Sequence, residues 1–424
     1  MNIAVIGSGY VGTTVAACFA DIGHQVTAID IDESVVSQLN RGESSLYEPG
    51  LDERIERTIG DRLHATTDYS ALLESDIVFI AVPTPSRSDG SIDVSAIDAA
   101  LAEALDTIAD AADAPTPLLV IKSTITPPEV ARLREIVTDR GHELAMNPEF
   151  QREGTAVDDF LSPDKLVFGV ESNRATELLC EAYEPIIEQT KPTIIETNPE
   201  TAAMIKYANN AFLAAKISLV NDLGNICKEF GIDAYEVADA IGTDHRISAE
   251  FLRSGVGFGG SCFPKDVAAL IAAARESGYE PPVLDATMAV NDAQPRRLLE
   301  LLEQYIDPTG KRVAVLGLAF KPGTDDIRNS RAIPVIDSLL EAGAEVTGYD
   351  PVANANMQEL FPDITYTDTA SDALQQADAA IVVTDWPEFS ELADEFSAMN
   401  EQIVIDGRRI ITPTDEMIYE GLTW

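Results

Sequence analysis

Apolar and polar positions along the first part of the chain follow the pattern of strands alternating with helices. Residues 2–6 form a short apolar run typical of a buried strand, and residues 13–23 carry apolar side chains at helical spacing. A second apolar run, 25–29, follows directly. Continuous apolar runs at 76–82 and 118–121 are typical of parallel strands covered on both faces. This part of the chain therefore predicts an α/β domain built on a parallel sheet.

The pattern changes near residue 200. Residues 202–231 are rich in alanine, contain no proline and carry apolar side chains three and four positions apart, which predicts one long helix. Lys206 and Asn210 are four positions apart and share a face of that helix. Their pattern alone favours a solvated face of the helix. We expect the helix to join two domains and to bury a face against a second subunit.

The strand and helix pattern returns after Gly310. Residues 311–320 read as a strand entering a glycine turn, and 345–349 read as a strand that ends at an acidic residue, Asp350. Strands at 379–383 and 402–406 complete this second α/β region. The predicted fold class is α/β, with two Rossmann-like domains joined by a central helical domain. The predicted boundaries are 1–195 for the nucleotide-binding domain, 196–300 for the central domain and 301–424 for the C-terminal domain.

The charge balance restricts the partners. The 424 residues include 72 acidic and 29 basic side chains, a net charge of −43, and such a surface repels nucleic acid and anionic membranes. A surface of this kind suits a cytoplasm of molar salt, where screening shortens charge repulsion to a few ångströms, and we therefore expect a halophilic source.

The cysteines and the N-terminus indicate the compartment. No apolar run is long enough to span a membrane, and the chain begins on a predicted strand instead of a signal peptide, so we expect a cytoplasmic protein. Four widely spaced cysteines and four scattered histidines predict neither a disulfide framework nor a metal site.

A glycine turn follows the first predicted strand. Gly7, Gly9 and Gly12 form a GxGxxG sequence between a strand and a helix, and Asp30 ends the next strand. This arrangement is typical of a dinucleotide-binding turn, and a carboxylate at the ribose position favours NAD over NADP. A turn without a ligand is the alternative.

Two threonines end later strands. Thr84 and Thr124 follow the predicted strands 76–82 and 118–121, so we expect them to line the cofactor crevice. Capping of the following helices is the alternative.

A second glycine-rich segment carries a cysteine. Residues 255–260 contain four glycines, and Cys262 follows, with Lys265 and Asp266 three and four positions later. A thiol beside a cation in a loop that approaches a ligand closely is typical of an activated nucleophile. The alternative is a flexible loop with a buried, inert cysteine.

Together these segments resemble the UDP-glucose/GDP-mannose dehydrogenase family of nucleotide-sugar 6-dehydrogenases. The resemblance extends over essentially the full length in the right order. The matching motifs are GSGYVG at 7–12, VPTP at 82–85, KST at 122–124, NPEF at 147–150 with Glu153 and Gly154, Lys206 with Asn210, GFGGSCFPKD at 257–266, AFKP at 319–322, TDDIR at 324–328 and DGR at 406–408.

The resemblance implies a reaction and the residues that carry it. A nucleotide-sugar C6 alcohol would be oxidised twice by NAD to a uronate, through a thiohemiacetal and a thioester on Cys262. Lys206 and Asn210 would stabilise the oxyanion, and Glu149 would act as the base in thioester hydrolysis. Asp266 and Thr124 would organise a water for proton transfer.

The resemblance also implies a substrate. UDP-glucose is favoured because Lys265 stands in the cysteine loop, with GDP-mannose and UDP-N-acetylhexosamines as alternatives. A protein that binds NAD and nucleotide sugars without catalysis is the other class considered.

Binding residues are carried over in the same way, with a homodimer through the central helix and no metal. Val35 departs from the family pattern, in which many relatives place a lysine near this position for the adenosine side. The cofactor set is Gly7, Gly9, Tyr10, Val11, Gly12, Asp30, Thr84, Thr124, Glu153, Lys265 and Arg328. The substrate set is Glu149, Phe150, Gln151, Arg152, Glu153, Lys206, Asn210, Arg246, Phe251, Leu252, Arg253, Ser254, Gly255, Gly259, Lys321 and Arg408.

Overall fold

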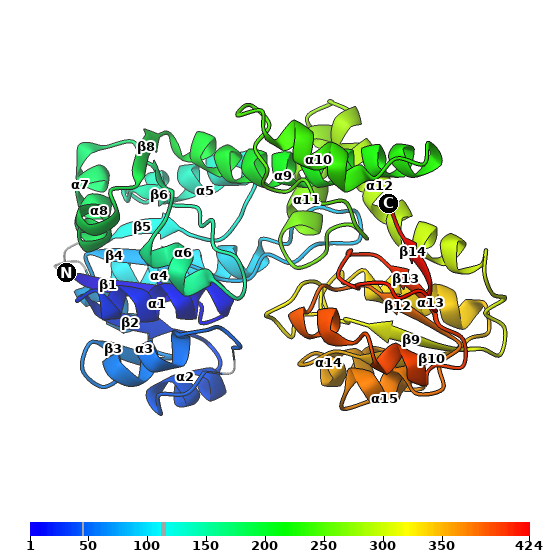
Figure 1. Ribbon diagram of the computed structural model, residues 1–424. Helices are drawn as coiled ribbons and strands as arrows, with labels where there is room; N and C mark the ends of the chain where they lie inside the picture. The colour runs from blue at the N-terminus through cyan, green and yellow to red at the C-terminus, as the bar shows by residue number, and fades with distance from the viewer. Residues whose placement is uncertain (45, 112–115) are drawn as a thin grey trace. The chain divides into compact units, whose positions relative to one another are not determined.

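The computed structural model describes residues 1–44, 46–111 and 116–424, which divide into two compact units. The units comprise residues 1–209 with 268–277, and residues 210–267 with 278–424. Each unit contains one sheet, and Figure 1 shows helices beside both sheets. The predicted fold class, two parallel-sheet α/β parts with a helical central segment, is confirmed. The three domain boundaries stay a prediction.

The first unit is built on an eight-stranded sheet in the order β3-β2-β1-β4-β5-β6-β7-β8. All neighbouring strands are parallel except β6 and β7. The strand order changes direction between β1 and β4, and ligands of such sheets bind at the carboxyl ends of the strands beside this point. The strands are β1 Asn2–Ile6, β2 Gln25–Ile29, β3 Leu63–Thr66, β4 Ile77–Ile80, β5 Leu118–Ile121, β6 Leu144–Met146, β7 Lys165–Gly169 and β8 Thr193–Thr197.

Helices cover both faces of this sheet because alternate side chains of each strand point to opposite sides. In β1, Ile3 and Val5 belong to one hydrophobic core, and Ala4 and Ile6 belong to the other. The helices of this unit that precede the long central one are α1 Tyr10–Asp21, α2 Glu33–Asn40, α3 Leu51–Thr58, η1 Tyr69–Glu74, α4 Ser95–Asp110, α5 Pro127–Asp139, α6 Ala156–Leu161, α7 Asn173–Ala182 and α8 Glu184–Thr190.

The central segment is helical, as predicted. The long helix is α9 Pro199–Glu229, and it is followed by α10 Ala234–Gly242, α11 Phe263–Glu276 and α12 Pro282–Leu302. Among the described residues, no helix combines the length and the apolar character needed to cross a membrane.

The second unit carries a six-stranded parallel sheet in the order β11-β10-β9-β12-β13-β14. This order repeats that of the first six strands of the other sheet, so the chain uses the same topology twice. The strands are β9 Arg312–Leu316, β10 Glu345–Tyr349, β11 Thr365–Tyr366, β12 Ala379–Val382, β13 Ile403–Asp406 and β14 Ile418–Gly421. The helices are α13 Ala332–Glu341, α14 Asn354–Leu360, α15 Ala370–Leu374, η2 Pro387–Glu391 and η3 Glu395–Ala398.

A lysine lies inside the first unit, directly after β5. Lys122 is 4% exposed, and its Nζ donates hydrogen bonds to Asn147 Oδ1 at 2.8 Å and to the Tyr183 hydroxyl at 3.0 Å. Burial lowers the pKa of Lys122 to about 7, a shift that the Glu149 carboxylate opposes and the Lys206 ammonium increases. The two acceptors hold the amine in the core, but its charge depends on pH near neutrality.

We expect Lys122 to make the stability of the fold depend on pH. Its folded pKa of about 7 lies below the ordinary value of 10.5, so between these values the unfolded chain binds one more proton. The free energy of unfolding should therefore rise with pH across this window, by at most about 1.4 kcal/mol per pH unit from this group. Chemical unfolding between roughly pH 7 and pH 9 should show a smaller rise for Lys122→Met than for the wild type.

The matched control is Lys191→Met, at an exposed position directly after α8. This variant should keep the wild-type rise. Equal slopes for the wild type and Lys122→Met would contradict the assignment.

Candidate active site

The glycine turn between β1 and α1 leaves room for a pyrophosphate. Gly7 has a φ of +96°, and a Cβ on Gly12 would lie 1.9 Å from the Gly7 carbonyl oxygen, so both positions require glycine. A Cβ on Gly9 would meet no atom within 4 Å. Gly9 is the N-cap of α1 and makes no side-chain cap, so the first amides of the helix face that open space, where they suit an anion.

Asp30 is held at this turn directly after β2. Its Oδ2 accepts a hydrogen bond from Ser8 N at 2.6 Å, and its Oδ1 accepts one from Asp32 N at 3.0 Å. The carboxylate thus stands at the position where a ribose diol binds and where a 2′-phosphate would be repelled. Val35, in α2, packs against the core of the first unit, and Val11 does the same from α1.

Thr84 and Thr124 lie together at the carboxyl ends of β4 and β5. The Thr84 hydroxyl donates a hydrogen bond to the Thr124 carbonyl oxygen at 3.0 Å. The capping alternative is wrong for both residues, because the N-caps of α4 and α5 are Val94 and Thr126. Their position agrees with the predicted crevice of the first unit.

Lys206 and Glu149 form a buried ion pair in the first unit. The Lys206 side chain is 3% exposed, and its Nζ lies 2.9 Å from Glu149 Oε1. The other Glu149 oxygen accepts a hydrogen bond from Gln151 N at 2.6 Å. The alternative that Lys206 stands on a solvated helix face is therefore wrong. The ring of Phe150 lies beneath both Lys165 and Lys206, with distances of 4.3 and 5.5 Å from Nζ to the ring centre.

The segment after Glu149 is a well-bonded loop. Arg152 N and the Arg152 guanidinium both donate to Asp159, which belongs to α6. Glu153 is half-buried and is followed by Gly154, whose φ is +82°. Both side-chain polar atoms of Gln151 are buried and make no hydrogen bond within the described structure. An amide in this state suits contact with a ligand.

In the second unit, the cysteine precedes a helix and its neighbours are paired. Asp266 N donates to the Cys262 carbonyl oxygen at 2.8 Å in the first turn of α11. The buried Asp266 carboxylate accepts from Asn210 Nδ2 at 2.6 Å and from Lys265 Nζ at 2.7 Å. Cys262 is half-buried, and Ser261 Oγ lies 3.6 Å from its Sγ. Cys262 thus stands directly before the first residue of α11.

The cysteine loop is built into its unit and is not a free surface loop. A Cβ on Gly259 would lie 2.3 Å from the Asn329 carbonyl oxygen, and one on Gly260 would lie 2.7 Å from the Phe320 ring. Gly260 N also donates to the Arg328 carbonyl oxygen at 2.8 Å. The flexible-loop alternative is therefore wrong. These glycines let the loop pack against the segment that carries Lys321 and Arg328.

The remaining predicted substrate residues of this unit fall into two groups. Ser254 and Gly255 are buried, and a Cβ on Gly255 would lie 3.2 Å from the guanidinium of Arg408. Leu252 is also buried. The exposed residues are Phe251, Arg253 (paired with Asp239) and Arg246 (paired with Asp244), and Lys321 is half-buried over the Phe320 ring. Arg328, predicted to contact the cofactor, is also exposed and is paired with Asp326.

The second unit has a similar glycine turn, but a carboxylate of the same unit occupies its amides. Asp350 follows β10 as Asp30 follows β2, yet its Oδ2 accepts from Leu318 N, Ala319 N and Trp386 Nε1. The carboxylate thus closes its own turn, and the turn in this unit does not offer the open amides seen at α1.

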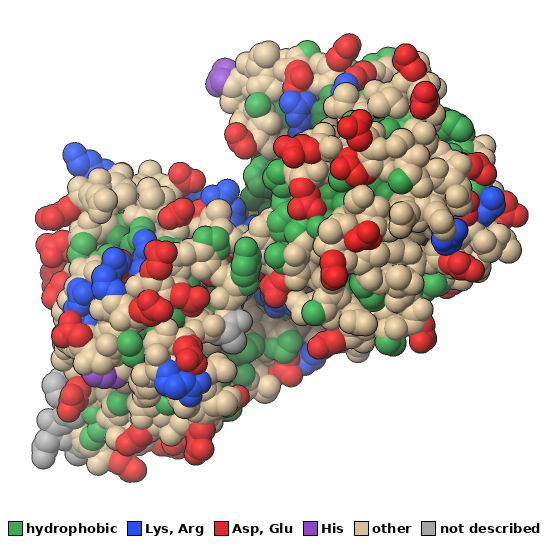
Figure 2. All heavy atoms as spheres, turned by 60° about the horizontal axis from the view of Figure 1, so that its bottom comes forward, with side chains coloured by type: hydrophobic (Ala, Val, Ile, Leu, Met, Phe, Trp, Pro, Cys, Tyr) green, Lys and Arg blue, Asp and Glu red, His purple; other side chains and the backbone are tan. Residues whose placement is uncertain are grey.

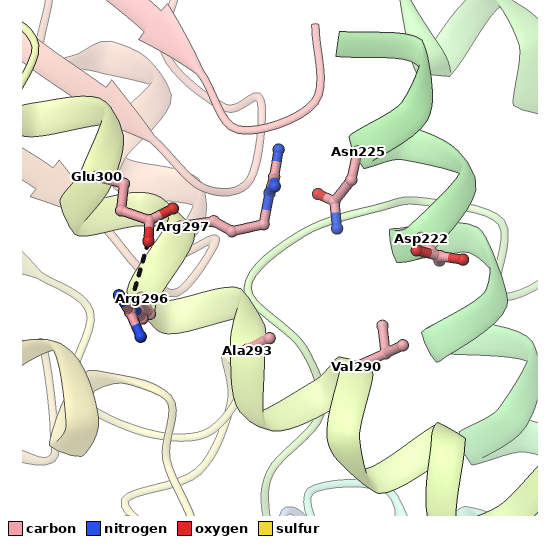
Figure 3. A pocket seen from close by; sticks show the side chains of 7 residues that line it. All are labelled: Asp222, Asn225, Val290, Ala293, Arg296, Arg297 and Glu300. Carbon is pink, nitrogen blue, oxygen red and sulfur yellow. Dashed lines mark hydrogen bonds and ion pairs between the residues drawn. The ribbon is translucent and has the colours of Figure 1, made fainter. Parts of the chain in front are cut away.

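A small hollow lies between α9 and α12 in the second unit (Figure 3). Its volume is about 310 Å³, and Arg296 pairs with Glu300 at 3.0 Å on its edge. None of the predicted catalytic or binding residues lines it. Its lining consists of Asp222, Asn225, Val290, Ala293, Arg296, Arg297 and Glu300.

Two buried polar residues of the first unit were given no role from the sequence. Lys122 and Glu48 are buried and hydrogen-bonded in the first unit, but Lys122 stands at the end of an apolar strand and Glu48 in a turn, where polar side chains are commonly solvated. The Tyr-Glu-Pro-Gly turn around Glu48 is the one local signal that marks an ordered position. In the described parts of the chain, His, Cys, Asp and Glu side chains form no cluster of three that could hold a metal ion.

Three family models match the chain in order. They describe the UDP-glucose/GDP-mannose dehydrogenase family: its NAD binding domain over residues 1–187, its central domain over 200–293 and its UDP binding domain over 314–413.

Curated relatives match over the whole chain. UDP-glucose 6-dehydrogenase AglM of Haloferax volcanii is 57% identical over 431 residues, covering 100% of both chains. A UDP-glucose 6-dehydrogenase of Rhizobium meliloti is 39% identical over 100% of this chain and 98% of its own length.

Solved structures share the fold. A UDP-glucose dehydrogenase from Pyrobaculum islandicum superimposes with a TM-score of 0.90 at 36% identity, covering 100% of this chain and 98% of that one. A UDP-D-ManNAc dehydrogenase from Pyrococcus horikoshii gives a TM-score of 0.86 at 28% identity, covering 100% and 99%. The protein belongs to the UDP-glucose/GDP-mannose dehydrogenase family and carries its NAD-binding, central and UDP-binding domains.

Proposed function

We propose that the protein oxidises the C6 alcohol of UDP-glucose to the carboxylate of UDP-glucuronate. The observation that carries the chemistry is the arrangement at the start of α11, where Cys262 precedes the helix and Asp266 is bonded to Asn210 and Lys265. Relatives named UDP-glucose 6-dehydrogenases, at up to 57% identity, favour this sugar. The structural likeness to a UDP-D-ManNAc dehydrogenase makes an N-acetylated sugar nucleotide the second candidate.

The overall reaction converts the alcohol, two NAD⁺ and one water into the carboxylate, two NADH and three protons. NAD supplies the two-electron oxidation in each of the two steps. Cys262 Sγ forms a bond to the C6 aldehyde carbon, which gives a thiohemiacetal, and the second oxidation gives a thioester. Water then breaks the S–C bond and the thiol regains its proton. Covalent attachment keeps the aldehyde from leaving between the two oxidations.

The chain's own residues would position the reacting groups. Lys206 and Asn210, one helical turn apart on α9, would donate to the oxyanion, and Glu149 would accept a proton from the water that attacks the thioester. The ion pair with Lys206 holds Glu149 in place for this step. Asp266 and Thr124 would orient a water, and Asp30 with the open turn at Gly9 would hold the cofactor.

We also propose that two copies of the chain associate through α9. Five large apolar side chains at intervals of seven, four, three and four residues form one stripe along the helix, and Phe212 and Phe230 at its ends are 71% and 73% exposed. Beside them lies a hollow of about 460 Å³ with a largely apolar lining that includes Val283 and Arg246. A stripe of this length on a helix is typical of an interface. Its members are Phe212, Leu219, Leu223, Ile226 and Phe230.

We also propose that the protein acts in the cytoplasm. The four cysteines are unbridged, which suits a reducing compartment, and we expect the reaction to take place in the cytoplasm.

Replacement of the nucleophile tests the mechanism and the substrate together. In about 2 M KCl, chosen to screen a net charge of −43, the wild type should form two NADH per UDP-glucose, and Cys262→Ser should form none beyond a slow first oxidation. UDP-N-acetylmannosamine and GDP-mannose are measured in parallel. Two NADH from one of these instead would move the specificity, and no NADH from any of them would favour a binding protein without catalysis.

Removal of the Lys206 amine should slow turnover without loss of cofactor binding. We expect Lys206→Ala to lower kcat by about 100-fold or more, the effect typical of one oxyanion donor. The Kd for NAD, measured by fluorescence titration, should stay within about twofold, since the cofactor turn lies at Gly9. Because the change leaves Glu149 buried without its partner, the thermal midpoint of Lys206→Ala is measured beside the wild type to check that the loss does not come from unfolding. Wild-type turnover in Lys206→Ala would remove this residue from the mechanism.

A charge on the α9 stripe should separate the subunits. Light scattering in about 2 M KCl should give twice the chain mass of 45.6 kDa for the wild type and about that mass for Leu219→Glu. Leu340→Glu, at an exposed apolar position of α13, is the control and should leave the mass unchanged. A wild-type mass of one chain would contradict the proposal.

A further inference from the structure

A buried carboxylate in the first unit has no place in the mechanism above. Glu48 lies between α2 and α3 and is 6% exposed. Its Oε1 accepts a hydrogen bond from Ala156 N at 2.7 Å, and its Oε2 accepts one from Gly154 N at 2.7 Å. The Tyr10 hydroxyl donates to the same Oε2. An ionised carboxylate is costly to bury, and these three donors compensate that cost.

The donors come from two segments: one is predicted to bind the cofactor, and the other carries mainly predicted substrate residues, with Glu153 predicted to contact both ligands. Tyr10 is the first residue of α1 and stands between Gly9 and Gly12 of the cofactor turn. Gly154 and Ala156 end the loop that begins at Glu149 and carries the predicted substrate residues. Gly154 N also lies 3.1 Å from the Tyr10 hydroxyl, so the hydroxyl, the amide and the carboxylate form one cluster. Burial, followed by the Glu48 carboxylate, raises the pKa of Tyr10, which keeps the hydroxyl a donor.

Glu48 differs from the other carboxylates that bind amides of this loop. Gln151 N is bound by Glu149, and Arg152 N is bound by Asp159, both of which lie within a few residues of their donors. Glu48 stands 106 positions before Gly154 and ties the loop to a different part of the unit. Fixing Gly154 thus also fixes the residue that opens α1.

We propose that Glu48 is a positioning residue that couples the cofactor turn to the substrate loop, so that occupancy of either raises the affinity of the other. A ligand that orders the turn orders the Glu48 cluster, and the loop then binds its own ligand with less ordering left to do. The coupling is reciprocal, as any coupling between two binding sites must be. This inference rests on the function proposed above for the identity of the sugar nucleotide.

The surrounding core allows a clean substitution. Phe160 of α6 packs edge-on against Phe19 of α1, with ring centres 5.0 Å apart, so the helices on either side of the cluster are held together without Glu48. Glu48→Gln keeps the shape of the side chain but replaces one acceptor oxygen by an amide NH₂ that faces a donor. We therefore expect this variant to fold and to lose the link.

The first measurement uses NADH and UDP-glucose, a pair that cannot react. The ratio of the UDP-glucose Kd without NADH to that with saturating NADH gives the coupling factor, which we expect to be at least about fivefold in the wild type. It should fall to within twofold of unity in Glu48→Gln. Tyr10→Phe removes one donor and should lower the factor partly. Glu53→Gln, exposed in the first turn of α3, should leave it unchanged.

The second measurement needs the cofactor alone and so separates this inference from the proposed function. Hydrogen exchange of the peptide covering 150–156 should slow on addition of NAD in the wild type and in Glu53→Gln, but not in Glu48→Gln. A purely structural role would lower the thermal midpoint of Glu48→Gln and leave both the coupling factor and the NAD-dependent protection intact, which would overturn the proposal. If the wild type oxidises no nucleotide sugar, the proposed function fails, and the exchange result still decides whether Glu48 links turn and loop. Should Glu48→Gln not fold, Tyr10→Phe carries both measurements, and wild-type behaviour of that variant would overturn the proposal.

Discussion

Burial of charge is the constraint on which the chemistry of the first unit depends. Lys206 and Glu149 are both removed from water and stabilise each other at 2.9 Å, so neither can be changed without leaving the other uncompensated. Lys122 lies close enough that both members of the pair affect its pKa. The Asn147 amide, which binds Lys122, precedes Glu149 by two residues. Core packing and the position of the proposed base are therefore set by the same few hydrogen bonds.

Exposure divides the basic residues that are predicted to bind ligands into two classes. Arg152, Arg246 and Arg328 are each paired with an aspartate, but more than half of each side chain faces water. Exposed pairs of this kind contribute about 0.2–1 kcal/mol, so an anionic diphosphate can replace the aspartate at little cost. Lys206 cannot exchange its partner in this way. A strongly acidic protein, with carboxylates spread over the face shown in Figure 2, can thus still present cations to an anionic substrate.

The sequence predicted the architecture well because the strands are continuous apolar runs and the turns are marked by glycine. β1 and β2 and the long helix α9 lie where the pattern places them. The turn at Gly9 could be predicted for the same reason, whereas α11, which begins directly after Cys262, was not predicted. The burial of Glu48 and Lys122 could not be predicted, since the sequence does not show whether a polar residue in a turn or at a strand end is solvated or buried. In Glu48 the burial comes from a loop 106 residues away. The glycines of the cysteine loop were expected to serve a ligand, and the structure shows that they also serve packing against Phe320 and Asn329.

The two units share a strand order but differ in the hydrogen bonds at their glycine turns. In both units an acidic residue follows the second strand, and backbone amides of the glycine turn donate to it. Asp30 accepts a hydrogen bond from a single amide of the turn, Ser8 N, and is half-exposed. The first amides of α1 therefore still face the open space beside Gly9. Asp350 accepts hydrogen bonds from two amides of its turn and from the Trp386 indole, and it is buried. Because its carboxylate already neutralises the turn, a pyrophosphate there would meet a fixed negative charge, so the second unit must hold a nucleotide by other residues. Divergence of a few side chains around one carboxylate is enough to separate the two functions.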